Sequence, residues 1–100
     1  MHATQTQYIE IRENRRGLPR PCVAGTRIRV QDIVLDYERH GCTADQIAVN
    51  LPPLSLAQVH SALAYYFDHK DEVLACIRDD EAYAKSQKAE LTGDASADEP

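Results

Sequence analysis

Apolar and polar residues alternate through the first predicted element, the segment YIEIRE at residues 8–13. Ile9 and Ile11 share one face and Glu10 and Arg12 share the other, which is the two-residue period of a β-strand. The NRRG sequence that follows predicts a turn. We therefore expect the fold to begin with a short strand.

The next segment also reads as β structure. Pro19 and Pro21 keep it extended and restrict it to a sheet edge, because proline has no N–H group to donate. In PCVAGTRIRV, two short β segments are predicted around Gly25, which can adopt the positive φ of a tight turn. Alternation places Arg27 and Arg29 on the polar face of the second segment. The first third of the chain is thus predicted to be a small β unit with arginines on its solvent side.

The apolar period lengthens to that of a helix in QDIVLDYERHG, residues 31–41. Ile33, Val34 and Tyr37 recur at helical spacing, so this segment is predicted to be the first helix. Gly41 is well placed to end it, because glycine readily adopts the left-handed conformation that closes a helix.

A second, short helix is predicted over residues 44–50. Thr43 and Gln46 stand at the two positions of a capping box, and the double proline Pro52-Pro53 stops the helix. A rigid break directly before the next helix is expected where that helix must leave its predecessor at a fixed angle. The pattern therefore predicts a helix-turn-helix.

The third helix is predicted over Leu56–His69, with Ser55 as its N-terminal cap. Its apolar positions recur at steps of three and four residues and define the face that is expected to enter the core. His60 lies beside this face and is expected to be a partly buried packing residue. The predicted core stripe consists of Leu56, Val59, Leu63 and Phe67.

A fourth helix is predicted after the His69-Lys70 joint, with Val73, Ile77 and Tyr83 facing inward. From residue 84 the sequence AKSQKAELTGDASADEP is small and polar, which is typical of a disordered segment. The expected organisation is a flexible N-terminus at residues 1–7, one domain with the β unit and the helix-turn-helix at 8–83, and a disordered acidic tail at 84–100.

Charge is distributed unevenly along the chain. The 100 residues are 27% charged and 43% hydrophobic, which is ordinary for one small globular domain. Residues 1–31 hold six arginines against two glutamates, a net +4, whereas the remainder has a net charge of −9. Such a chain can face a polyanion with one part and a basic protein with the other, or simply carry an uneven solvated surface.

Several classes of protein are not indicated. No stretch approaches the roughly 18 apolar residues that span a bilayer, and the start MHATQTQ lacks the regions of a secretory signal. Cys22, Cys42 and Cys76 show no C-x-x-C spacing, which argues against a zinc site or a disulfide framework. We expect three reduced thiols in a cytoplasmic protein.

Catalytic chemistry is not indicated either. The four histidines are scattered and form no H-E-x-x-H motif. Asp79-Asp80-Glu81 is expected to be a solvated acidic helix end. Cys22 would be reactive if Arg20 lowered its pKa, but a small buried thiol is the preferred interpretation. We therefore expect no enzyme, no metal and no cofactor.

The helix-turn-helix pattern and the arginines together predict DNA binding. In such motifs the first residues of the second helix face base edges, while arginines neutralise phosphates. The predicted second helix has no lysine or arginine, so phosphate contacts are expected from the β unit, acting like a wing. Ala62 is expected on the outward face of this helix. The predicted DNA-binding residues are Arg12, Arg15, Arg16, Arg27 and Arg29 for phosphates, and Ser55, Gln58 and Ser61 for bases.

Four parts of the sequence together resemble one prokaryotic family, catalogued as domain of unknown function 433 and often labelled a VapB-type antitoxin. They are PCVAGTRIRVQDIV, Tyr37 followed by Gly41, the Thr-x-x-Gln-Ile of Thr43–Ile47, and LPPLSLAQVHSALAYYFDHKDEV. The resemblance covers about residues 8–78. It implies a mainly α fold, a homeodomain-like or winged helix-turn-helix domain of three to four helices preceded by a short β unit.

The resemblance also implies a function, the antitoxin of a type II toxin–antitoxin pair. Such a protein neutralises a PIN-like ribonuclease toxin by direct binding and represses its own operon by binding DNA. Its acidic part, Asp68–Glu81 with the tail, is expected to meet a basic toxin surface. A homodimer is expected, because the strand edge YIEIR can pair with a second copy and such operators are usually palindromic. The alternatives are a helix-turn-helix-shaped protein-interaction module without DNA binding and, third, a small hydrolase.

Overall fold

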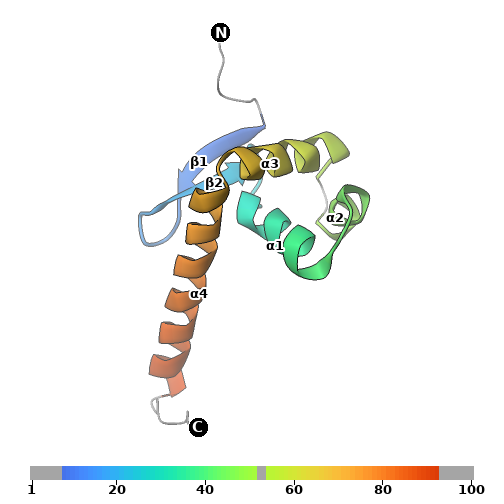
Figure 1. Ribbon diagram of the computed structural model, residues 1–100. Coiled ribbons are helices and arrows are strands. Elements are labelled where there is room, and N and C mark those ends of the chain that lie inside the picture. The colour runs from blue at the N-terminus through green and yellow to red at the C-terminus, as the bar shows by residue number, and fades with distance from the viewer. Residues whose placement is uncertain (1–7, 52–53, 93–100) are drawn as a thin grey trace.

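The computed structural model describes residues 8–51 and 54–92. Two short strands are followed by four helices, so the domain is mainly α with a small N-terminal β unit, as the sequence predicts (Figure 1). Predictions for residues 1–7, for Pro52-Pro53 and for residues 93–100 lie outside the described residues. The elements are β1 (Ile9–Glu13), β2 (Pro19–Val23), α1 (Val30–His40), α2 (Ala44–Asn50), α3 (Leu56–Asp68) and α4 (Lys70–Thr92).

The β unit is a two-stranded antiparallel hairpin. Its register sets Ile9 opposite Val23 and Ile11 opposite Pro21. Ile9 and Val23 are buried in the core, whereas Ile11 is 57% exposed. The alternation in YIEIRE therefore predicts the strand correctly, although only the first of its two isoleucines belongs to the core.

The segment after β2 forms a turn, so the prediction of a second β segment there is wrong. Thr26 closes this turn, because its backbone N–H and its hydroxyl both donate to the carbonyl of Val23, at 3.0 and 2.9 Å. Gly25 has a φ of 79°, which suits glycine. Arg29 meets Cys22 in a single isolated bridge and then serves as the N-cap of α1. The turn and the helix cap use the backbone groups that a strand would need.

Helix boundaries follow the predicted local signals. Gly41 ends α1 with a φ of 65°. Thr43 and Gln46 cap α2 reciprocally: each backbone N–H donates to the other side chain, at 2.8 and 3.2 Å. Ser55 and Gln58 repeat this arrangement at α3, at 2.7 and 3.1 Å. Such capping satisfies backbone N–H groups that have no partner within the helix, so α2 and α3 begin where the sequence predicts.

The buried face of α3 is rotated from the predicted stripe. Two of the four predicted core positions are largely exposed, Phe67 by 53% and Leu56 by 42%, so the prediction for them is wrong. Tyr66 is buried in place of Phe67, and its hydroxyl donates to Glu38 Oε2 at 2.6 Å. A buried phenol with an acceptor keeps its hydrogen bond, so the tyrosine can enter the core. The buried residues of α3 are Val59, Ala62, Leu63 and Tyr66.

Helix α4 is longer than the sequence analysis predicts. Val73 and Ile77 are buried as expected, but Tyr83 is 43% exposed, so its predicted inward position is wrong. The expected disorder is also wrong for residues 84–92, because these residues are helical. This part contains mostly strong helix formers, namely alanine, lysine, glutamine and glutamate. Its last turns project from the domain (Figure 1).

The core lies where the helices meet the hairpin. α3 packs against α1 and α2, and α4 packs against α1 and α3. No helix in the described part of the chain is long and apolar enough to cross a membrane. The fully buried side chains include Val23 of β2, Ile33 and Val34 of α1, Ile47 of α2, Val59 of α3 and Val73 of α4.

Candidate nucleic-acid interface

The loop between β1 and β2 carries two adjacent arginines. Asn14 organises this loop, because its Oδ1 accepts hydrogen bonds from the backbone N–H groups of Arg16 at 2.8 Å and Leu18 at 3.0 Å. Gly17 has a φ of 77°, and its N–H donates to the Asn14 carbonyl at 2.9 Å. One side chain therefore fixes the loop, and with it the backbone of Arg15 and Arg16.

A hollow of about 470 Å³ lies against the hairpin and the turn after β2, and we call it the hairpin hollow. Among the described residues that line it, five are arginines and Glu13 is the only acid. Several guanidinium groups around one hollow favour an anionic ligand. The hairpin hollow is lined by Arg12, Glu13, Asn14, Arg15, Arg20, Cys22, Arg27 and Arg29.

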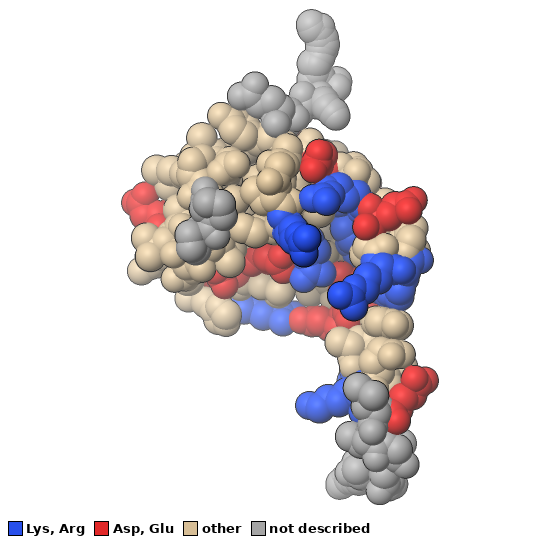
Figure 2. All heavy atoms as spheres, turned by 180° about the vertical axis from the view of Figure 1, so that it is seen from behind, with Lys and Arg blue, Asp and Glu red and all other residues tan. Residues whose placement is uncertain are grey.

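Three of the predicted phosphate-binding arginines, Arg12, Arg15 and Arg27, are exposed around this hollow. Arg15 and Arg27 have no hydrogen-bond or ion-pair partner within residues 8–51 and 54–92. Arg12 donates from Nη1 to the Thr26 carbonyl at 2.7 Å and lies 3.8 Å from a carboxylate oxygen of Glu10. Figure 2 shows basic side chains gathered over the hairpin. These three arginines form the open group.

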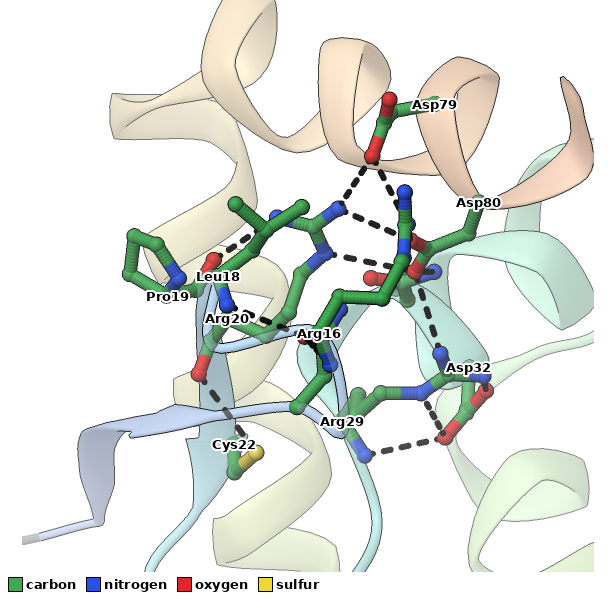
Figure 3. A network of polar contacts seen from close by, with 11 residues as sticks. Arg16, Leu18, Pro19, Arg20, Cys22, Arg29, Asp32, Asp79 and Asp80 are labelled. Carbon is green, nitrogen blue, oxygen red and sulfur yellow. Dashed lines mark hydrogen bonds and ion pairs between the residues drawn. The ribbon is translucent and has the colours of Figure 1, made fainter. Parts of the chain in front are cut away.

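Arg16 and Arg29, the other two predicted phosphate ligands, are engaged within the protein (Figure 3). Arg16 donates from Nη2 to Asp79 at 2.9 Å and to Asp80 at 2.8 Å. Arg29 donates to Asp32 from Nε at 3.2 Å and from Nη2 at 2.8 Å, and to Asp80 from Nη1 at 3.2 Å. We call these two arginines the paired group, since carboxylates already occupy them.

Arg20 has a structural role that the sequence analysis missed. Among the arginines that the structure describes it alone is buried, at 6% exposure. It donates to Asp80 from Nε at 3.2 Å and from Nη2 at 2.8 Å, and to Asp79 from Nη2 at 2.8 Å. The hydrogen bond from Arg20 is the main cause that lowers the pKa of Asp80, and the same bond raises the pKa of Arg20. This ion pair holds α4 against β2.

The segment Asp79-Asp80-Glu81 is therefore not the solvated acidic helix end that the sequence suggests. Asp80 is 18% exposed and accepts from three arginines. Glu81 is paired with Arg39 of α1, and the hydrogen bond from Arg39 lowers the pKa of Glu81. These three acids are already engaged, so the acidic surface open to a basic partner is smaller than predicted. The acids exposed near the α3–α4 joint are Asp68, Asp71 and Glu72.

The predicted base-reading residues differ in availability. The Gln58 side-chain oxygen and the Ser55 hydroxyl both accept hydrogen bonds in the α3 cap. Gln58 can therefore contact a base by donating from its Nε2. Ser61 is half-buried. Two further expectations for α3 are wrong: Ala62 is buried, and His60 is exposed. The rotation of α3 that buries Tyr66 accounts for both.

The arginines and the start of α3 lie at opposite ends of this helix. Figure 1 shows the N-terminal end of α3 on the far side of the domain from the hairpin loop. Thirteen helical residues separate the two ends, which corresponds to about 20 Å. The structure thus brings the predicted phosphate ligands together but keeps them apart from Ser55 and Gln58.

Metal and thiol chemistry find no support in the described residues. No group of three or more metal-ligating side chains comes together within them. Cys22 is buried, as expected, and burial raises the pKa of its thiol. A reactive cysteine needs the opposite shift, so Cys22 is a packing residue.

Comparison with known proteins gives one match. A family model described as protein of unknown function (DUF433) matches residues 12–66, more than half of the chain. The matched span includes the open group of arginines, α1, α2 and most of α3, and it ends before α4. No curated protein and no solved structure matches the chain.

Proposed function

The chain belongs to the DUF433 family of proteins of unknown function, and we propose that it is the antitoxin of a type II toxin–antitoxin pair. It neutralises a PIN-like ribonuclease toxin by direct binding and, as a homodimer, represses its own operon by binding operator DNA. Both activities take place in the cytoplasm. DNA binding depends on the hairpin, and toxin binding depends on the outer side of α3.

The open group of arginines is the observation that carries the DNA-binding part. Phosphate contacts supply most of the affinity of a protein for DNA of any sequence, and no described residue competes for Arg15 or Arg27. The start of α3 supplies a separate contact to bases through Gln58. A duplex that touches both must span the length of α3, which is about 20 Å, and the further distance to the arginines.

The outward face of α3 supports the toxin-binding part. Residues 54–67 contain no charged side chain, and Phe67 and Leu56 are largely exposed. An exposed apolar face of this kind favours contact with another protein rather than with nucleic acid. The exposed acids Asp68 and Asp71 follow directly, and they complement a basic surface such as that of a ribonuclease.

The edge of β1 supports a homodimer. The described sheet has two strands, and Ile11 on β1 is 57% exposed. A short edge strand with an exposed apolar residue can pair with the same strand of a second copy, and a two-fold dimer matches a palindromic operator.

The test combines two binding measurements on the full chain. Fluorescence anisotropy with the upstream promoter fragment is run at several salt concentrations, with and without the product of the adjacent gene, which the proposal expects to be a PIN-like nuclease. Salt-sensitive DNA binding and direct binding of that product support the proposal. Toxin binding without DNA binding supports the alternative, a protein-interaction module, which the lack of lysine and arginine in α3 favours. If the chain binds neither the DNA fragment nor that gene product, both the proposal and the alternative are refuted.

A further inference from the structure

A second hollow, of about 450 Å³, adjoins the hairpin hollow, and we call it the helix hollow. The two hollows share Asn14, Arg15 and Arg29. Arg16 from the loop and Tyr83 and Gln87 from α4 line the remainder, together with Asp80. Three guanidinium groups therefore face a space that α4 closes on one side.

The paired group remains accessible from the helix hollow. The hydrogen bonds from Arg16 to Asp79 and Asp80 both come from Nη2, and the Arg16 side chain is still 26% exposed. Its guanidinium lies 4.1 Å from the centre of the Tyr83 ring, a cation–π contact that fixes its position. The Arg29 side chain is 38% exposed. Both arginines can therefore be reached by an anion in this hollow.

The two carboxylates that hold Arg16 are not equivalent. Asp80 is 18% exposed and is also bound by Arg20, Arg29 and Gln31. Asp79 is 50% exposed and contacts only Arg16 and Arg20 among the described residues. Asp79 is thus the carboxylate that an incoming anion can replace while Asp80 still binds Arg20 and holds α4 against β2.

We propose that Arg15, Arg16 and Arg29 form a concealed phosphate site in the helix hollow, where the Asp79 carboxylate competes with phosphate oxygens for Arg16. The phosphate is a phosphodiester group of duplex DNA, so the inference rests on the proposed function. Carboxylate and phosphate oxygens both accept hydrogen bonds from the guanidinium fork, which is why one can stand in for the other. Asp79 therefore limits DNA contact to the hairpin hollow until a phosphate displaces it.

The test compares Asp79→Asn with Glu81→Gln in the full chain. The two residues are two positions apart and so point to opposite sides of α4. Each substitution removes one negative charge from the helix. Asp79→Asn removes one of the two carboxylates bound by Arg16 and one of the two bound by Arg20, whereas Glu81→Gln removes the carboxylate bound by Arg39. We expect Asp79→Asn to raise DNA affinity and to steepen the slope of log K against log salt by about one unit, because one more phosphate is neutralised. Glu81→Gln should leave the slope unchanged.

Thermal melts should show that both variants are folded, because Asp80 still binds Arg20 in each of them. A titration with inorganic pyrophosphate, followed by NMR at the Arg16 Nε–H and the Tyr83 ring, tests the site without DNA. Equal DNA slopes for the two variants, in a protein that binds DNA, overturn the concealed site and leave the proposed function standing. If no form binds DNA, the proposed DNA binding fails. In that case the NMR shifts caused by pyrophosphate test the concealed site. Larger shifts in Asp79→Asn than in the parent support the site, and the absence of such shifts overturns it.

Discussion

The guanidinium of Arg20 on β2 donates to the carboxylate of Asp80 on α4 at 2.8 Å, although 60 residues separate the two in sequence. Arg16, Arg29 and Gln31 bind the same carboxylate, so the hairpin, its following turn and α1 all meet α4 at one side chain. Asp80 is therefore the residue through which the N-terminal β unit and the last helix hold each other.

Removing that carboxylate should destabilise the fold strongly. Asp80→Ala leaves the buried Arg20 without its main partner, and breaking a buried ion pair costs about 3–5 kcal/mol. Urea unfolding measures the change. Glu81→Ala, which breaks the exposed pair with Arg39, should destabilise the fold far less, because water and salt screen an exposed ion pair. Similar losses for the two variants would contradict the role given to Asp80.

Stability should fall in acid because of the same group. The pKa of Asp80 is lowered in the folded state from its ordinary value of 3.8, mainly by the hydrogen bond from Arg20. Its stabilising contribution is therefore complete above that ordinary value and is lost as the pH falls toward the lowered pKa. Melting temperatures from pH 6 to pH 2 should decrease less steeply in Asp80→Asn than in the parent. Parallel curves would show that Asp80 does not carry this dependence.

Truncation of Tyr66 should lower the stability of the fold much more than truncation of Phe67. Tyr66 is 1% exposed, so Tyr66→Ala should cost about 3–5 kcal/mol, as for other large core aromatics. Phe67 is 53% exposed, so Phe67→Ala should lower the free energy of unfolding by less than about 1.5 kcal/mol. Chemical denaturation of both variants checks the register of α3. A larger loss for Phe67→Ala would mean that the helix is turned the other way.

The open arginines should dominate DNA affinity. Arg15→Gln and Arg27→Gln together should weaken binding to every sequence and flatten the salt slope by about two units, provided that both contact phosphates. Gln58→Ala should relax the preference at one base position and leave the slope unchanged. Anisotropy titrations at several salt concentrations separate the two effects. An unchanged slope in the double arginine variant would remove the hairpin hollow from the interface.

Toxin association should depend on the acids beside the exposed end of α3. Asp68→Asn with Asp71→Asn removes attraction to a basic surface, so the association rate should fall and depend less on salt. The matched control is Glu10→Gln with Glu90→Gln, which removes the same charge from exposed sites on β1 and late α4. Stopped-flow mixing with the product of the adjacent gene, which is the expected toxin, measures the association rates of both double variants. Equal rates for the two double variants would place the toxin surface elsewhere.

Features that depend on neighbouring residues could be predicted from the sequence. The caps Thr43–Gln46 and Ser55–Gln58 form within four residues of chain, so the residue types at these positions predict them. The helix count and the first strand follow from periodicity for the same reason. Arg12 could be predicted in the same way, because alternation places it on the polar side of the first strand. Arg15 and Arg27 lie in turns, where strand alternation does not apply.

Features that depend on distant partners could not be predicted. Whether Tyr66 or Phe67 enters the core depends on Glu38, 28 residues away, which accepts the phenol hydrogen bond. The division of the arginines into open and paired groups depends on carboxylates of α4. One local signal was available for Arg20: it alternates with Leu18 and Cys22 and so falls on an apolar face.

The Asn14 side chain has a consequence for the kinetics of ligand capture. Because it closes the loop around Arg15 and Arg16 through two backbone hydrogen bonds, the loop is ordered before any ligand arrives. The entropy lost on binding is then confined to arginine rotamers, about 0.5–1.5 kcal/mol for each side chain. A phosphate that reaches this loop meets a preorganised receptor, so the rate of capture is set by diffusion and electrostatic steering and not by loop folding.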